Sequence, residues 1–122
     1  MDPVTARFIE TATALPPATL ATVFDEMVKR RSTGGREASR EAKVSASENS
    51  SINRAVRSAL LPRADELTES RNGLHSDAIS ACGIAARAVR KRGKLTEEQY
   101  VVLVEPFMRT DAAVPAWTPE GN

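Results

Sequence analysis

The chain has 122 residues, with 17 basic and 16 acidic side chains and a formal net charge of +1, which suits one domain and excludes a general attraction to nucleic acid or an anionic membrane. Nineteen residues are alanine and five are aromatic, so the core is thin in large side chains, and self-association that buries more apolar surface is expected. A lone cysteine, Cys82, no signal peptide pattern and no apolar run near the length of a membrane span favour a cytoplasmic protein.

Two amphipathic helices are predicted at the start of the chain. Asp2 can cap the first, whose first turn suits Pro3, and Pro16 and Pro17 separate it from the second. Gly34 follows the basic end of the second helix. The apolar positions that share one face are Val4, Phe8, Ile9, Ala12 and Leu15 in the first helix, and Leu20, Val23, Phe24, Met27 and Val28 in the second.

Residues 32–51 interrupt the helical pattern. This stretch has one large apolar side chain, Val44, so it cannot bury enough surface to offset the entropy of ordering. The composition predicts a mobile polar linker, with at most a transient helical turn around residues 36–44. It either stays solvated, which the composition favours, or orders on a partner.

A third and a fourth helix are predicted after this linker. Ser50 and Ser51 can cap the third, which Pro62 kinks or interrupts, and Asn72 and Gly73 mark a stop. The fourth runs from about residue 76 to residue 92. Its apolar stripe is Ala78, Cys82, Ala85 and Val89, widened by Ile79, Ala81 and Ala86, whereas Ser76, Ser80, Gly83, Arg87 and Arg90 form the wetter face.

The fifth helix, over residues 96–108, has a strong start signal. Thr96 and Gln99 form a capping box, and Leu95 with Tyr100 can form a hydrophobic staple. A kink or an end is expected near Pro106. Residues 1–110 are therefore interpreted as one helical domain, and residues 111–122 as a tail containing prolines and a tryptophan.

Basic residues gather at two helix ends and allow two interpretations. Cations favour the negative end of a helix dipole, and Gly93 can close the fourth helix, so the helix-end interpretation is preferred. The alternative is an anion or nucleic-acid site. As a recognition helix, residues 96–108 are disfavoured because Glu97 and Glu98 repel phosphate. The candidate contacts are Lys29, Arg30, Arg31, Arg87, Arg90, Lys91, Arg92 and Lys94.

The single histidine and the single cysteine lack the further residues that a catalytic or metal site would need. His75 is interpreted as an exposed turn or cap residue and Cys82 as an inert core thiol. With one histidine and one cysteine, no metal site, cofactor site or catalytic residue is predicted. Trp117 stands in a tail otherwise poor in large apolar residues, and either docks on the bundle, which is preferred, or contacts a partner.

One set of residues spans the last third of the chain: Leu95, Thr96, Glu98, Gln99, Tyr100, Leu103, Pro106 and Phe107. This pattern resembles a motif of small uncharacterised helical proteins of high-GC Gram-positive bacteria. That resemblance implies no activity.

The sequence therefore predicts an all-α fold, a compact bundle of about five helices with a long polar linker between the second and third. The leading hypothesis for function is a non-enzymatic interaction or regulatory module that binds protein, itself included. Binding of nucleic acid or a phosphate ligand through the basic helix ends is the alternative. A small-ligand binder or enzyme is the third possibility, which a pocket with convergent polar groups would support.

Overall fold

Helices make up the regular structure of residues 1–119, the part of the chain that this computed structural model describes, and no strand occurs there. The predicted all-α class is confirmed. The α-helices are α1 (Pro3–Ala12), α2 (Pro17–Arg30), α3 (Gly35–Glu41), α4 (Ala46–Leu60), α5 (Ala64–Ser70), α6 (Leu74–Arg90) and α7 (Glu97–Met108). Short 3-10 turns are η1 (Arg31–Thr33), η2 (Leu61–Arg63) and η3 (Arg92–Lys94).

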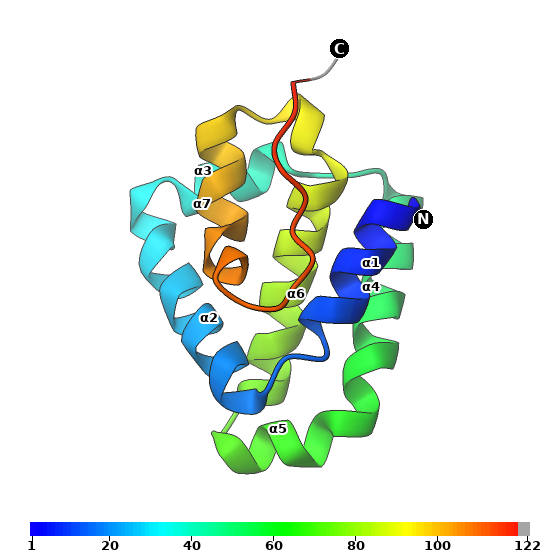
Figure 1. Ribbon diagram of the computed structural model, residues 1–122, viewed down its shortest axis with the longest axis vertical. Coiled ribbons are helices and arrows are strands. Elements are labelled where there is room, and N and C mark those ends of the chain that lie inside the picture. Colours follow the sequence, from blue (N-terminus) through cyan, green and yellow to red (C-terminus); the bar gives the residue numbers. More distant parts are fainter. Residues whose placement is uncertain (120–122) are drawn as a thin grey trace.

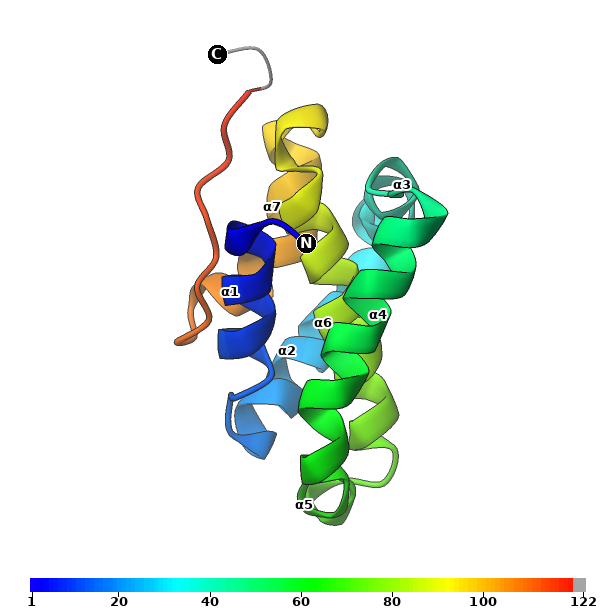
Figure 2. The same cartoon turned by 90° about the vertical axis from the view of Figure 1, so that its right-hand side faces the viewer.

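Helix α6 forms the centre of the bundle. It packs against α1, α2, α4, α5 and α7, which surround it in both views (Figures 1 and 2). Its buried residues are mostly alanine, and these small side chains let the neighbouring backbones come close. The predicted apolar stripe is confirmed, but Gly83, expected on the wetter face, is buried because α4 also covers that side.

Helix α1 packs on α6 and reaches α7 through an aromatic pair. The rings of Phe8 and Phe107 meet edge to face, with centroids 5.2 Å apart. The prediction that Val4 faces the core was wrong, since its exposed fraction is 38%. Thr5 is buried instead, and its hydroxyl donates to the carboxylate of Asp2 at 2.7 Å.

The prediction of a long linker over residues 32–51 was wrong about secondary structure. The stretch contains η1, α3 and the first turns of α4. Helix α3 packs on α7 and buries small residues, Gly35 and Ala38, followed by Ala42. Close packing of small side chains replaces the large apolar residues whose absence suggested disorder.

Helix α4 begins earlier than expected because its cap is Ser45. The Ser45 hydroxyl accepts a hydrogen bond from the amide of Glu48, so Ser50 and Ser51 lie inside the helix rather than at its start. The expected interruption at Pro62 is confirmed as the 3-10 turn η2. The stop at Gly73 is confirmed by a φ of +84°, which glycine adopts without strain.

Helix α7 follows the predicted capping box closely. The Thr96 hydroxyl accepts from the amide of Gln99, whose side chain accepts from the amide of Thr96. Pro106 lies within the helix, which ends two residues later. Residues 111–119, called the strap below, then run back between α7 and α1 (Figure 1).

Candidate functional site

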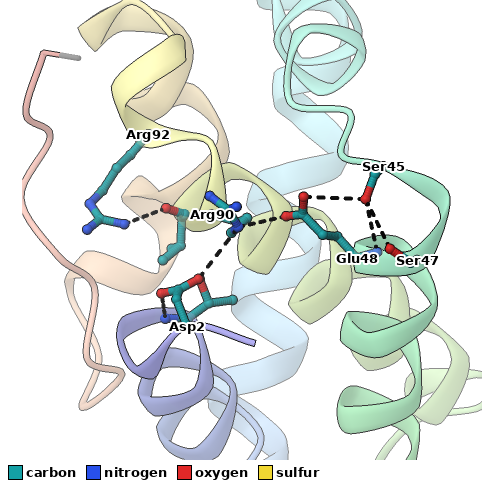
Figure 3. Close-up of polar contacts among 8 residues, drawn as sticks. Asp2, Ser45, Ser47, Glu48, Arg90 and Arg92 are labelled. Atoms are coloured by element: carbon teal, nitrogen blue, oxygen red, sulfur yellow. Dashed lines mark hydrogen bonds and ion pairs between the residues drawn. The ribbon is translucent and has the colours of Figure 1, made fainter. Parts of the chain in front are cut away.

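The arginines at the end of α6 are engaged within the protein. Nε of Arg90 lies 2.7 Å from Oε2 of Glu48 and 3.7 Å from Oδ2 of Asp2 (Figure 3). Arg92 donates to the carbonyl of Val89 at 2.8 Å, a contact that satisfies the helix end. The Arg92 contact thus fits the helix-end interpretation, whereas Arg90 is held by the carboxylates of two other segments.

Arg87 and Lys94, two other basic residues of this junction, also make contacts within the protein. Arg87 is partly buried, which lowers the pKa of its guanidinium, and it donates to Oδ1 of Asn49 at 3.4 Å. The amide of Lys94 donates to the carbonyl of Lys91 at 2.8 Å and completes η3. A cavity of about 510 Å³ beside this turn is lined by the carboxylates of Asp2 and Glu48 as well as by cations, so its field is mixed.

The second basic helix end lies beside a different cavity. Arg30, at the end of α2, pairs with Glu105 of α7, with Nη2 and Oε1 3.1 Å apart. Arg30 and Arg31 line a groove to which no residue from 87 to 94 contributes. Both helix ends lie at the same end of the bundle (Figure 1), but they do not line one common site.

The groove beside α3, called the arginine groove below, has a volume of about 530 Å³. Its floor is apolar and comes from α2, α6 and α7. Its rim comes from the end of α2, η1 and α3. The floor is formed by Phe24, Met27, Val28, Ala81, Ile84, Val102 and Leu103, and the rim by Arg30, Arg31, Gly35, Arg36, Ser39 and Arg40.

The charges of the arginine groove are of one sign. No Asp or Glu among the described residues lines it. Within the described part of the chain, Arg31, Arg36 and Arg40 make no ion pair or side-chain hydrogen bond, in contrast to Arg30. Arg36 and Arg40 lie one turn apart on the same side of α3. A positive rim therefore stands beside an apolar floor.

Gly35 allows α3 to form this rim. A Cβ atom at Gly35 would lie 2.6 Å from the carbonyl oxygen of Arg30, closer than any real side-chain carbon sits. The glycine therefore permits α3 to pack directly against the end of α2. Gly34, just before it, has a φ of +98° and turns the chain between the two helices.

Sequence reasoning singled out Arg30 and Arg31 but missed the rest of the groove. Arg36 and Arg40 fell in the predicted linker, and the floor combines positions from helices far apart in the chain. The spacing of Arg36 and Arg40 around the small Ala38 was the available signal, because it is typical of a short amphipathic helix.

The other candidate residues lie apart from the groove. His75 is the second residue of α6, partly buried rather than exposed, and its Nε2 has no hydrogen-bond partner among the described residues. Cys82 is fully buried, and this burial raises the pKa of its thiol to about 12, although the charge of Arg63 opposes the shift. The described residues contain no cluster of three or more His, Cys, Asp or Glu that could hold a metal ion.

Trp117 docks on the bundle, as preferred from the sequence. Its indole Nε1 donates to the carbonyl of Leu95 at 2.9 Å, and its ring packs against the core. The Tyr100 hydroxyl donates to the carbonyl of Pro115 at 2.6 Å. Burial raises the pKa of Tyr100 to about 12 against the charge of Arg92, which keeps the phenol protonated as a donor.

Comparisons of the chain with known proteins found no similar protein, so a function can be inferred from the geometry alone. No protein-family model matches the chain, and neither a curated protein nor a solved structure is matched. No helix among residues 1–119 is long and apolar enough to cross a membrane.

Proposed function

We propose that the chain is a protein-interaction module that binds an acidic, amphipathic segment of a protein in the arginine groove. The observation that carries this proposal is the combination of an apolar floor with three guanidinium groups that pair with no acid among the described residues. Such a rim attracts carboxylates, and such a floor accepts apolar side chains.

The floor suits a helix or an extended peptide. Val28 is 40% exposed, and Met27 and Phe24 beside it are partly buried. A flexible methionine can adapt to different apolar partners, and arginine is enriched where protein surfaces meet. An amphipathic segment would bury its apolar face on these residues and place acidic residues toward α3.

The alternative of anion binding through both basic helix ends has less support. Arg90 and Arg92 already contact acceptors of this chain, and the cavity next to them includes two carboxylates. A small anionic ligand also fits the size of the arginine groove. The following experiment distinguishes such a small ligand from a peptide.

Selection of random peptides on the immobilised protein tests the proposal. We expect enrichment of peptides that combine Asp or Glu with Leu, Ile or Phe. The replacement Val28→Gln removes an apolar side chain from the floor without adding charge. It is expected to lower the affinity of the groove for these peptides about fivefold, which corresponds to ~1 kcal/mol. Met108→Gln is the matched control, because Met108 is 43% exposed and lies outside the groove.

Two results would count against a protein-binding groove. One is the recovery of no peptide that Val28→Gln weakens more than Met108→Gln does. The other is that no peptide binds, while a small aromatic carboxylate such as naphthoate binds the groove saturably. Chemical-shift changes at Val28 would detect that binding.

A further inference from the structure

One corner of the molecule exposes an apolar side chain beside acidic residues. Leu61 in η2 is 69% exposed, more than any other large apolar residue described. Asp65 and Glu69 of α5 are both exposed, and neither makes an ion pair within the described residues. We call Leu61, Asp65 and Glu69 the acidic corner.

The acidic corner matches the arginine groove in chemistry and in spacing. Asp65 and Glu69 lie one turn apart on α5, so they share one side of that helix, and Leu61 precedes them in the turn η2. Arg36 and Arg40 have the same interval on α3. Residues four apart on a helix are separated by roughly 5–6 Å between Cβ atoms, so two acids can face two arginines in register.

We propose that the arginine groove receives the acidic corner of a second copy of this chain. Leu61 of one copy lies against the floor at Val28 of the other, and Asp65 and Glu69 face Arg36 and Arg40. This inference rests on the proposed function, since it uses the same groove, and it names one occupant.

The placement of the two surfaces requires two copies. Helix α3 lies at one end of the bundle and α5 at the opposite end, in both views (Figures 1 and 2). A chain cannot therefore fill its own groove. Because the two surfaces differ, they can pair once in a head-to-tail contact, which builds rings or open chains, or twice in an antiparallel two-fold dimer.

The expected association is weak and sensitive to salt. It relies on one exposed leucine and two surface ion pairs, and ion pairs between solvated side chains stabilise a contact only weakly. The weight-average mass is expected to rise with protein concentration toward the millimolar range at about 50 mM salt. It should fall back toward the monomer mass at about 500 mM salt, where charges are screened within a few ångströms.

Charge reversal on each surface tests the pairing by sedimentation equilibrium. The double variants Arg36→Glu/Arg40→Glu and Asp65→Lys/Glu69→Lys are each expected to stay monomeric, because like charges then meet. An equimolar mixture of the two is expected to associate, because each altered surface finds an opposite charge on the other variant. Arg7→Glu/Lys91→Glu is the matched control, since neither side chain lines the arginine groove or belongs to the acidic corner.

Leu61→Gln gives a readout that does not depend on charge or on the stability of α3 and α5. It is expected to abolish association while circular dichroism and the melting temperature stay at their original values. A wild-type chain that remains monomeric up to about 1 mM at low salt overturns the inference. So does association that Arg7→Glu/Lys91→Glu reduces as much as Arg36→Glu/Arg40→Glu does.

Failure of self-association can be separated from failure of the proposed function. Peptides that bind the groove in a monomeric protein would overturn the second copy as occupant and leave the groove as a protein-binding site. Loss of both self-association and peptide binding would overturn both proposals.

Discussion

Arg90 connects residues that lie far apart in the chain. Its guanidinium contacts Glu48 of α4 and Asp2, the cap of α1 (Figure 3). The helix dipole correctly predicts its place at a helix end, but Gly93, which was expected to close α6, lies within η3 without a left-handed φ. Its two acidic partners could not be predicted, since they depend on where α1 and α4 pack around α6.

Asp2 is the residue at which this contact depends on pH. Partial burial acts to raise its pKa, but hydrogen bonds from the hydroxyl and amide of Thr5 and the charges of Arg90 and Arg92 outweigh it. The pKa of Asp2 therefore lies below its ordinary value of 3.8. A carboxylate with a lowered pKa stabilises the fold above its unfolded pKa, and this contribution is lost as the pH falls through the folded value.

Asp2→Asn is expected to lower the free energy of unfolding at pH 7, because it keeps a capping side chain and removes the charge. The difference from wild type should shrink as the pH falls through 3.8 and further down. Urea denaturation at a series of pH values measures it. Glu10→Gln on the same helix is the control, expected within about 0.5 kcal/mol of wild type. A difference for Asp2→Asn that stays constant down to pH 2 contradicts the role of the charge.

Helix α3 shows what the sequence could not predict at the level of an element. Amphipathic helices with large apolar residues, and the capping box of α7, were predicted correctly because their signals are local. Helix α3 buries Gly35 and Ala38, residues that contribute little apolar area and give no strong periodic signal. Its stability comes from close approach to α2 and α7, which composition does not reveal.

Two glycine-to-alanine replacements test the close approach of α3. Gly35→Ala forces a carbon toward the Arg30 carbonyl and is expected to lower the free energy of unfolding by about 1–3 kcal/mol. Gly83→Ala, in α6, is the matched control. Its added carbon would meet the flexible Arg87 side chain at 3.4 Å, and better helix propensity should raise stability by up to about 1 kcal/mol. Equal effects of the two replacements in urea titrations would contradict this account.

The strap belongs to the fold through contacts of its own. Trp117→Ala removes the hydrogen bond to Leu95 and the packing of the ring, so the free energy of unfolding is expected to fall by about 2 kcal/mol. Trp117→Phe keeps much of the apolar area and should cost about half as much. Thermal denaturation compares the two. A melting temperature unchanged by Trp117→Ala would instead indicate a tryptophan that is free to contact a partner.

For the whole molecule, the core was easier to predict than the arginine groove. Core residues follow from periodicity within each helix, so Leu20, Val56 and Cys82 are buried as expected. The groove depends on five elements, α2, η1, α3, α6 and α7, whose arrangement is set by tertiary packing. Arg36 and Arg40 can form one rim only after α3 exists and rests against the end of α2.

Cys82 reports on opening of the entire bundle. Its thiol is fully buried on the central helix, and desolvation raises its pKa to about 12, against the charge of Arg63. Ellman's reagent at pH 8 is therefore expected to label it at the rate of global unfolding, with labelling that accelerates in urea as the unfolded fraction grows. Ser80→Cys in a Cys82→Ala background, which moves the thiol to an exposed position of α6, should react at once. Fast labelling of Cys82 without denaturant would reveal local opening of α6.

The strap also determines when the protein can finish folding during its synthesis. The amide of Ala113 donates to the Thr11 hydroxyl across a separation of 102 residues, and the Phe8 ring contacts the ring of Phe107. The first helix to leave the ribosome thus lacks its last partners until nearly the whole chain has been translated. The part of its surface that contacts α7 and the strap, Phe8 included, therefore stays uncovered until those segments have been translated. Completion of the bundle is therefore a late event, which follows translation of the strap rather than proceeding helix by helix.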